Sequence, residues 1–417
     1  MISLRKNLFR AATATVCAAT VGGGLHASEP AKKPLNIMLI TADDLHRDSL
    51  GCYGGKPEGM TPNIDKFATE SLRFERAHVN CAICAPSRAI LGTGLYGHNS
   101  GAMGFQYARP DVPTVIGLLQ KNGYMTGILG KVDHSTPNKS AQWDFSKNQK
   151  SLGDGRDPEK YYEYCKEFFA NAKAENQPFY FMVNSHDPHR PFHYAGKTKK
   201  GSKEPSKTYT AKEAVVPGFL ADLSGVKKEV AAYQNSVRRF DDTFGKVMQA
   251  LEESGQKDNT LVVFISDNGI AMPFAKANAY LASSLTPWIV RWPGRVKENS
   301  INRDDFISGI DFLPTVLEVT GIKKPRKLDG VSFLPLLDGE TQAGRERVFT
   351  QIDAKISGPP VPMRCIQDKK YGYIFNAWSD GELYYSNNNQ GRSWGAMKNS
   401  KEKAIQENYF LSICYLE

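Results

Sequence analysis

Four short apolar runs in this chain end abruptly in polar and ionisable residues. They are PLNIMLITADD (34–44), GYMTGILGKVDH (123–134), PFYFMVNSHDPH (178–189) and TLVVFISDNG (260–269). Runs that are uniformly apolar, rather than alternating between apolar and polar, are typical of strands buried on both faces of a sheet. The pattern therefore predicts four interior strands, each with polar side chains at its carboxyl end.

Helical patterns separate these runs. PTVIGLLQKNG (113–123) closes on Gly123, and the amphipathic stretch from Val230 to about Glu253 is followed by Gly255, so both end as helices commonly do. Alternation of strands and helices predicts an α/β fold with a doubly wound, mostly parallel sheet. Ligands of such sheets bind beyond the carboxyl ends of the strands. All four polar clusters should therefore gather at one edge.

The chain is long enough for a large core. Its 417 residues are 41% hydrophobic, which favours one big domain with an appendage, or two domains. We find no internal repeat. The net charge is +9, and a mildly basic protein suits a polyanionic substrate, although charge alone does not identify one. No basic run with interleaved aromatic residues indicates nucleic-acid binding.

The first residues predict an export signal. Arg5, Lys6 and Arg10 precede a small-residue, weakly apolar stretch, and LHA before Ser28 suits a cleavage site. An anchoring helix is the alternative, but the stretch is short and rich in Gly and Ala. We expect a signal peptide at 1–27 and a periplasmic or secreted protein. No later run has about 18 consecutive apolar residues, so the mature chain should not span a membrane. Its six cysteines are scattered, unlike a disulfide scaffold.

Two of the polar clusters offer oxygen ligands. Asp43 and Asp44 follow the first run, and Asp267 and Asn268 follow the last. Carboxylate and amide oxygens suit calcium or magnesium. The alternative is that Asp43 or Asp44 caps a following helix. Acidic groups crowded at one sheet edge would repel one another without a cation, which favours a metal site.

Basic residues follow the other runs. A lone lysine or histidine at a strand end is usually just solvated. Gathered around a metal, however, such residues could bind a tetrahedral anion and move protons. The four candidates are Lys131, His134, His186 and Lys276.

Cys84 has three interpretations. With Cys81 it forms CAIC, a redox spacing, but the order of strands and helices around it is wrong for a thioredoxin. A zinc site would need a second pair at suitable spacing. A nucleophile at a helix start fits, because Pro86 suits the first turn and a helix N-terminus favours negative charge.

CAPSRAILGTG (84–94) resembles the signature of the type I sulfatases, Cys-x-Pro-Ser-Arg followed by a Leu/Thr/Gly segment. The resemblance implies that Cys84 is oxidised to formylglycine by a formylglycine-generating or an anaerobic sulfatase-maturating enzyme. It also implies that Ser87 and Arg88 hold the segment, with Arg88 near the metal and the aldehyde. GTG at 92–94 departs from the more common LTG.

The resemblance covers residues 35 to about 339, and the motifs occur in the family's order. It implies an alkaline-phosphatase-like catalytic domain at 34–340 and a smaller C-terminal antiparallel-sheet subdomain at 341–417. RCIQDKKYGYIFNAW (364–378) matches the first part of that subdomain. The family's later Leu-Tyr-Asp, Asp-Pro segment is not found before the final CYLE, so we expect the subdomain to be incomplete.

The resemblance also implies roles for the candidates. Asp43, Asp44, Asp267 and Asn268 match the ligands of one Ca²⁺, and formylglycine at Cys84 would complete its coordination. One hydroxyl of the hydrated aldehyde would attack sulfur, and His134 would deprotonate the other to release sulfate. Lys131, His186, Lys276 and Arg88 would hold the sulfate or assist the leaving group. His134 follows Lys131 by three positions where many members have two.

Two motifs suggest the substrate. SHDPHRPF (185–192) and SDNGIAMPFAK (266–276) look most like the N-sulfoglucosamine sulfohydrolase branch, whose basic residue also falls eight positions after the Asn. We therefore expect hydrolysis of glucosamine N-sulfate in heparin- or heparan-type glycans. Asp187, His189 and Arg190 are then substrate-pocket candidates, unless Asp187 and His189 merely brace the loop. The alternatives are an O-sulfoglycan sulfatase, a phosphodiester or phosphonate hydrolase, and an inactive glycan-binding homologue.

Overall fold

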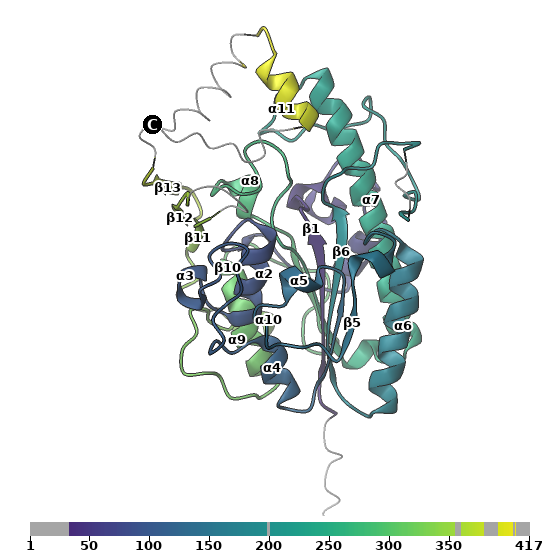
Figure 1. The fold of residues 1–417 in the computed structure, drawn as a ribbon, viewed down its shortest axis with the longest axis vertical. Helices are drawn as coiled ribbons and strands as arrows, with labels where there is room; N and C mark the ends of the chain where they lie inside the picture. Colours follow the sequence, from purple (N-terminus) through teal and green to yellow (C-terminus); the bar gives the residue numbers. More distant parts are fainter. Residues whose placement is uncertain (1–32, 198–200, 355–359, 379–390, 403–404, 406–417) are drawn as a thin grey trace, which may run out of the picture. The chain divides into compact units, whose positions relative to one another are not determined.

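The four apolar runs form four consecutive strands of an eight-stranded sheet (Figure 1). They are β4 (Met125–Leu129), β6 (Phe179–Pro188), β1 (Asn36–Asp43) and β7 (Thr260–Ser266), in that spatial order and all parallel. Every residue of β1, β6 and β7 is buried. The predicted doubly wound, mostly parallel sheet is confirmed, and the polar ends of these strands meet at its carboxyl edge.

This computed structural model describes residues 33–197, 201–354, 360–378, 391–402 and 405. The predicted signal peptide lies outside these residues. No helix among the described residues is long and apolar enough to cross a membrane.

The other strands complete the main sheet and form two smaller ones. β5 (Phe145–Lys147) pairs with β4 at one edge. Beyond β7 come β8 (Trp288–Arg291), β2 (Leu72–Phe74) and β9 (Ser300–Asn302), and β8 is antiparallel to both of its neighbours. The small sheets pair β3 (Ala77–His78) with β10 (Ile307–Ser308), and β11 (Val348–Ile352) with β12 (Met363–Gln367) and β13 (Gly372–Asn376).

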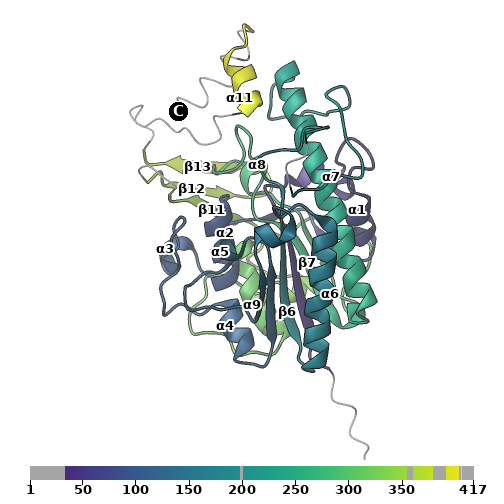
Figure 2. The ribbon, with the colours of Figure 1, turned by 45° about the vertical axis from the view of Figure 1, so that its right-hand side comes forward.

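Helices cover both faces of the main sheet (Figure 2). In β1, Met38 and Ile40 join a core with α1 (Pro62–Thr69), α6 (Pro158–Ala174) and α7 (Ser224–Glu253). Ile37 and Leu39 point the other way, because side chains alternate along a strand, and join a core with α2, α4, α9 and α10. These four helices span Cys84–Thr93, Val115–Gln120, Phe312–Val319 and Leu334–Leu337.

Short elements lie mainly in the connections. They are the helices α3 (Gly97–Ser100), α5 (Val132–Ser135), α8 (Leu281–Ser284) and α11 (Gly391–Lys398), and the 3₁₀ turns Arg47–Ser49, Gly51–Tyr53, Gln149–Leu152, Lys257–Asn259 and Gly309–Asp311.

Both predicted helices exist, but the longer one starts earlier than expected. The chain turns at Gly123 and Gly255, which have φ of +80° and +72°, after α4 and α7 respectively. α7 begins at Ser224, six residues before Val230. Its first turns carry lysines beside the buried Val226 and Glu229, so only one apolar side chain precedes Val230 there and the apolar pattern is too sparse to mark the start of the helix.

The small C-terminal sheet packs beside the predicted site. The segment 364–378 contributes to the β12–β13 hairpin, as expected for an antiparallel subdomain. Met363 and Cys365 belong to one apolar cluster with Cys81, Ile83 and Ala277. The sheet therefore borders both the segment before Cys84 and the loop that carries Lys276.

Candidate metal and anion site

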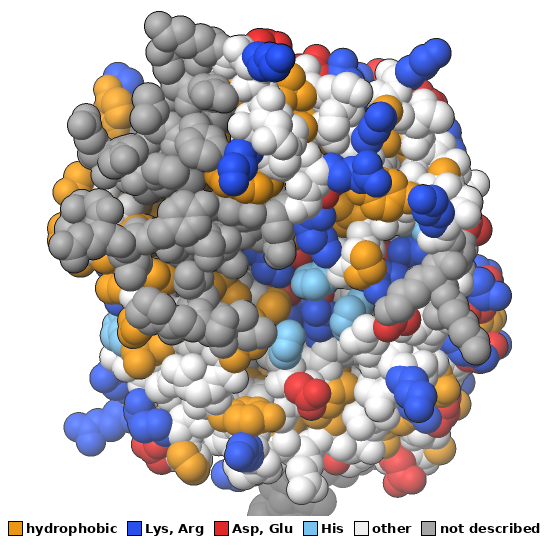
Figure 3. Space-filling model, turned by 45° about the horizontal axis from the view of Figure 1, so that its top comes forward, with side chains coloured by type: hydrophobic (Ala, Val, Ile, Leu, Met, Phe, Trp, Pro, Cys, Tyr) orange, Lys and Arg blue, Asp and Glu red, His pale blue; other side chains and the backbone are white. Residues whose placement is uncertain are grey.

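The carboxyl ends of the parallel strands bring the predicted site residues together. In Figure 3, histidine side chains and lysine or arginine side chains gather in a hollow near the centre of the face. The candidate metal ligands Asp43, Asp44, Asp267 and Asn268 are all fully buried.

Hydrogen bonds join the ends of β1 and β7 directly. The backbone N–H of Asp44 donates to Asp267 Oδ1 at 3.1 Å, and Asn268 Nδ2 donates to Asp44 Oδ1 at 2.7 Å. Asp44 has a φ of +68°, a left-handed conformation that is uncommon outside glycine. The strained backbone turns the second acid of the pair toward the end of the neighbouring strand.

Four buried oxygens of this cluster have no hydrogen-bond partner: Asp43 Oδ1, Asp43 Oδ2, Asp44 Oδ2 and Asn268 Oδ1. Of these, Asp43 Oδ2 faces Lys131 in an ion pair. An unsatisfied buried acceptor is costly, and oxygens of this kind are the ligands that Ca²⁺ prefers. Burial raises the pKa of Asp267 to about 6 against the opposing effect of Arg88, and the Asp43 and Asp44 carboxylates add to the rise. A hard cation would relieve both penalties, so these residues fit one.

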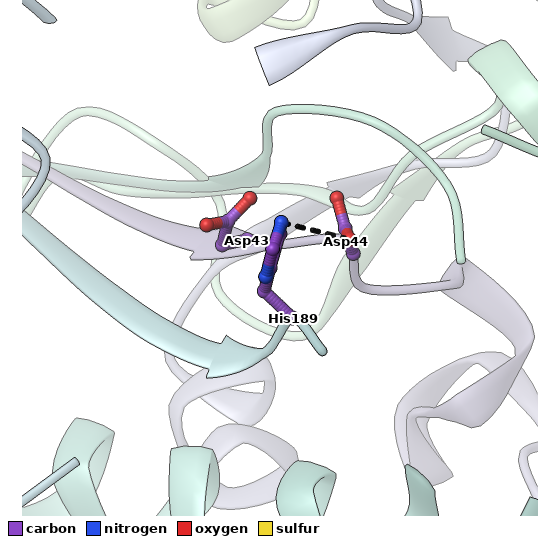
Figure 4. Close-up of side chains that lie close together, drawn as sticks. All are labelled: Asp43, Asp44 and His189. Atoms are coloured by element: carbon purple, nitrogen blue, oxygen red, sulfur yellow. Dashed lines mark ion pairs between the residues drawn. The ribbon is translucent and has the colours of Figure 1, made fainter. Parts of the chain in front are cut away.

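His189 is the histidine that stands beside the two adjacent carboxylates. Its Nε2 lies 3.8 Å from Asp44 Oδ2, and ligand atoms of Asp43, Asp44 and His189 all lie within 4.8 Å of one another (Figure 4). The sequence offered His189 as a substrate contact, which stays a prediction, and the structure also places it next to the candidate metal ligands.

Two lysines face the same carboxylates from different loops. Lys131 Nζ pairs with Asp43, and Lys276 Nζ pairs with Asp44. Lys131 follows Gly130, where a Cβ would lie 2.2 Å from the backbone oxygen of Asn184, so glycine lets β4 turn there. Burial would lower the pKa of Lys276, but Asp44 raises it above its ordinary value. Both lysines therefore lie where an anion bound beside these carboxylates would meet them.

Cys84 begins α2, and Arg88 lies one turn later on the same helix face. Arg88 donates from Nε to Asp267 Oδ2 at 2.9 Å, and from Nη1 to Thr41 Oγ1 at 2.9 Å and Asn184 Oδ1 at 2.6 Å. Arg88 is fully buried and therefore fixes the Cys84 helix to the ends of β1, β6 and β7. Burial raises the pKa of the Cys84 thiol. Cys81 and Cys84 are free thiols rather than a disulfide.

Two further histidines have neutral rings. Burial, followed by the positive charge of Lys131, lowers the pKa of His134 to about 4. Burial and Lys131 lower the pKa of His186 to about 2. The Nδ1 atom of each ring has no hydrogen-bond partner. The lowered pKa keeps both rings unprotonated, the form a general base must have, but makes each ring a weaker base than an ordinary histidine.

The three candidate substrate contacts lie in different environments. Asp187 is fully buried, and Arg156 and Arg239 both donate hydrogen bonds to its carboxylate, which matches the alternative of a bracing role. Arg190 donates to Ala271 O at 3.0 Å and to Glu229 Oε1 at 2.6 Å. The roles of all three in substrate binding stay predictions.

The sequence did not single out the partners of these groups. Thr41 and Asn184 lie within the quoted strands, one to two residues before the polar clusters, and a search for polar residues inside apolar runs could have found them. Glu229 and Arg239 lie within α7, and only the packing of that helix against the loops makes them part of the site.

Comparison with known proteins agrees with this geometry. The family model described as Sulfatase matches residues 35–322, and the model described as N-sulphoglucosamine sulphohydrolase, C-terminal, matches residues 271–409. The chain is 29% identical over 376 residues to human (Homo sapiens) N-sulphoglucosamine sulphohydrolase, covering 82% of this chain and 74% of the relative. It is 31% identical to an ulvan-active sulfatase of Formosa agariphila over 349 residues, covering 83% and 66%.

A solved structure of another activity shares the fold. The phosphonate monoester hydrolase of Agrobacterium radiobacter superposes with a TM-score of 0.66 at 19% identity, covering 82% of this chain and 87% of that one. The fold alone therefore does not choose between sulfate and phosphonate chemistry.

Proposed function

The chain belongs to the sulfatase family, and we propose that this member removes the N-sulfate of glucosamine from heparin- or heparan-type saccharides. Its action on sulfated carbohydrates follows from the family and the relatives. The N-sulfate is supported chiefly by the match of residues 271–409 to the C-terminal region of N-sulphoglucosamine sulphohydrolases. That region includes the loop of Lys276 and the small sheet packed beside it.

The site fits two groups that sulfatases typically use. Asp43, Asp44, Asp267 and Asn268 would hold Ca²⁺, and Cys84 would carry formylglycine. When present, the cation supplies positive charge for the sulfuryl oxygens and the hydrated aldehyde supplies a nucleophilic hydroxyl.

Side chains around the candidate metal ligands would bind the sulfate group and position the nucleophile. Lys131 and Lys276 approach from two loops, so both can bind sulfuryl oxygens in the space next to Asp43 and Asp44. Charge placed in this way stabilises a transition state more than it would in water, because the surroundings are buried. Arg88 holds the start of α2 against the carboxyl ends of the strands through its hydrogen bonds to Asp267 and Asn184.

Proton transfer is assigned to the neutral imidazoles. His134, whose Nδ1 has no hydrogen-bond partner, is assigned as the general base that the family resemblance implies. His189 lies at the Asp44 carboxylate and His186 is more deeply buried. Either histidine, or Lys276, would donate a proton to the departing sugar nitrogen.

The proposal includes maturation and export. The Cys-x-Pro-Ser-Arg segment at 84–88 is the substrate for a formylglycine-generating or anaerobic sulfatase-maturating enzyme. The basic and small-residue start of the chain supports export to the periplasm or the medium.

The test measures sulfate release by protein produced with a formylglycine-generating enzyme. Glucosamine N-sulfate, glucosamine 6-sulfate, a galactosamine sulfate and an aryl phosphodiester are compared, with Cys84→Ala as the control. Selective release from the N-sulfate, lost in the control, is the expected result. Release only from an O-sulfate rejects the N-sulfate assignment and points to an O-sulfoglycan sulfatase. Hydrolysis of the phosphodiester alone points to the phosphodiesterase or phosphonate hydrolase alternative. Protein that carries the aldehyde but turns over none of these contradicts the proposal.

A further inference from the structure

The segment from Ser100 to Pro110 forms a closed loop that has no role in the reaction proposed above. The backbone N–H of Arg109 donates to Ser100 O at 2.9 Å, and Gly101, with a φ of +90°, begins the turn between them. Within the loop, Phe105 is half-buried and packs against the interior. The loop therefore has fixed ends and turns one aromatic ring toward the body of the protein.

This loop also holds the chain just after α5, the short helix that carries His134. The backbone N–H of Ala108 donates to Pro137 O at 2.7 Å, and Asn138 Nδ2 donates to Pro110 O at 3.3 Å. Both contacts lie within three residues of the end of α5. The position of the helix is therefore coupled to the position of the loop.

Phe105 touches the imidazole of His134 directly. The two rings meet edge to face, with 5.6 Å between their centroids and 79° between their planes. Phe105 also packs against the apolar cluster that contains Ile83, the residue before Cys84, and side chains of the small C-terminal sheet. The ring that meets His134 is thus fixed relative to the segment that carries the candidate nucleophile.

No hydrogen bond orients the imidazole of His134 within the part of the chain that the structure describes. Its Nδ1 is buried without a partner, and neither ring nitrogen takes part in a hydrogen bond there. Other buried histidines do have such partners: His78 Nδ1 lies 3.1 Å from Ser284 Oγ, and His193 Nε2 lies 2.7 Å from Glu204 Oε2. The outer torsion of a histidine side chain is broad, so packing has to set the direction of this ring.

We propose that Phe105 is a positioning residue, whose ring holds the His134 imidazole in the orientation that proton transfer needs. The inference rests on the proposed role of His134 as general base, and it adds what orients that base. An edge-to-face pair of rings is directional, which an aliphatic contact is not. A general base must lie within hydrogen-bond reach of the proton that it removes, so a ring that turns freely is in position for less of the time.

The first test measures the two products of a single turnover. Glucosamine N-sulfate is mixed with excess protein produced with a formylglycine-generating enzyme, and glucosamine and sulfate are followed by rapid quenching. Glucosamine 6-sulfate takes its place if the wild type hydrolyses only the O-sulfate. In the proposed reaction the sugar departs first, and His134 then acts in sulfate release. Phe105→Leu keeps an apolar side chain but removes the ring, so it should slow sulfate release about three- to tenfold and leave glucosamine release unchanged.

Two further variants serve as controls. Phe105→Tyr keeps the ring and should release sulfate at the wild-type rate. Phe306→Leu removes a buried ring that stacks on His78 outside the site, with 5.7 Å between centroids, and should change neither rate. The inference is overturned if Phe105→Leu slows both products equally or leaves sulfate release unchanged, or if Phe105→Tyr is as slow as Phe105→Leu.

A second test does not depend on turnover. In protein labelled with carbon-13 histidine, NMR relaxation gives the order parameter of the His134 Cε1–H bond, whose resonance is the one lost in His134→Asn. Phe105→Leu should lower this order parameter, and Phe306→Leu should not. That result supports the positioning role even if His134→Asn still releases sulfate and the proposed role of His134 fails. An order parameter in Phe105→Leu equal to that of the wild type overturns the inference even if His134→Asn releases no sulfate.

Discussion

Arg190 donates from Nη1 to Glu229 Oε1 at 2.6 Å, and Glu229 is only 1% exposed. The same carboxylate accepts hydrogen bonds from the backbone N–H groups of Arg392 at 3.2 Å and Ser393 at 2.6 Å, at the start of α11. Arg190 also donates to the backbone of Ala271 in the loop after β7. This ion pair thus connects the loop after β6 and the loop after β7 to α7 and to the N-terminus of α11.

Glu229→Gln should lower the free energy of unfolding by about 2–4 kcal/mol. The substitution keeps the size of the side chain but leaves Arg190 without its counter-charge and weakens the bonds to the α11 backbone. Urea unfolding measures the change. Glu252→Gln, at an exposed position of the same helix, is the matched control and should change stability by less than about 0.5 kcal/mol. Equal effects of the two substitutions would contradict the role of the pair.

Calcium should raise the melting temperature of the wild type, because a ligand that binds only the folded state stabilises it by about 2.7 kcal/mol at 100 times its Kd. Asn268→Ala should remove the calcium-dependent increase, since it deletes one of the unpartnered buried oxygens. Asp133→Asn, an exposed acid near the site, should retain it. Calorimetric scans with calcium and with a chelator give the comparison. A wild-type melting temperature that does not respond to calcium rejects the site.

His189→Gln should weaken calcium binding by about 10- to 100-fold, because His189 stands 3.8 Å from the Asp44 carboxylate that the ion needs. His186→Gln should affect calcium binding less, since no ion pair joins His186 to Asp43 or Asp44 in the described part of the chain. Calcium titrations of the two variants compare their dissociation constants for calcium. The reverse order would show that His186 is the histidine coupled to the metal.

Ionisation of the buried Asp241 carboxyl should lower the free energy of unfolding as the pH rises. Burial raises the pKa of this carboxyl to about 7 from an ordinary value of 3.8, against the hydrogen bonds donated by Ile64 N and Asn63 N of α1. A raised folded-state pKa contributes stability that is fully present below about pH 4 and is lost as pH rises through about 7. The free energy of unfolding of wild type, taken relative to that of Asp241→Asn, should therefore fall by about 3 kcal/mol between pH 5 and pH 8.

Unfolding in urea at several pH values measures that difference, with Asp222→Asn at an exposed position as the control. A difference between wild type and Asp241→Asn that does not vary with pH would show that Asp241 remains ionised throughout.

The local pattern of apolar residues was sufficient to predict the strands that carry the site residues. β1, β6 and β7 are apolar on both faces because helices cover both faces, and such runs differ visibly from the alternating strands of a half-exposed sheet. The start of α7 was missed because Lys227, Lys228 and Glu229 interrupt the apolar spacing. Glu229 is buried there only because Arg190 and the α11 backbone satisfy its charge.

The sequence by itself determined the order of strands and helices, the sheet edge at which polar residues collect, and the chemical types available there. The tertiary structure alone decided which of those residues meet. His189, which the sequence offered only as a substrate contact, faces Asp44, and Asp187 turns inward to Arg156 and Arg239. The reason is physical. Strand periodicity is a short-range property of the chain, whereas the partners of these buried charges lie 31 to 232 positions away and are brought within hydrogen-bond distance only by packing.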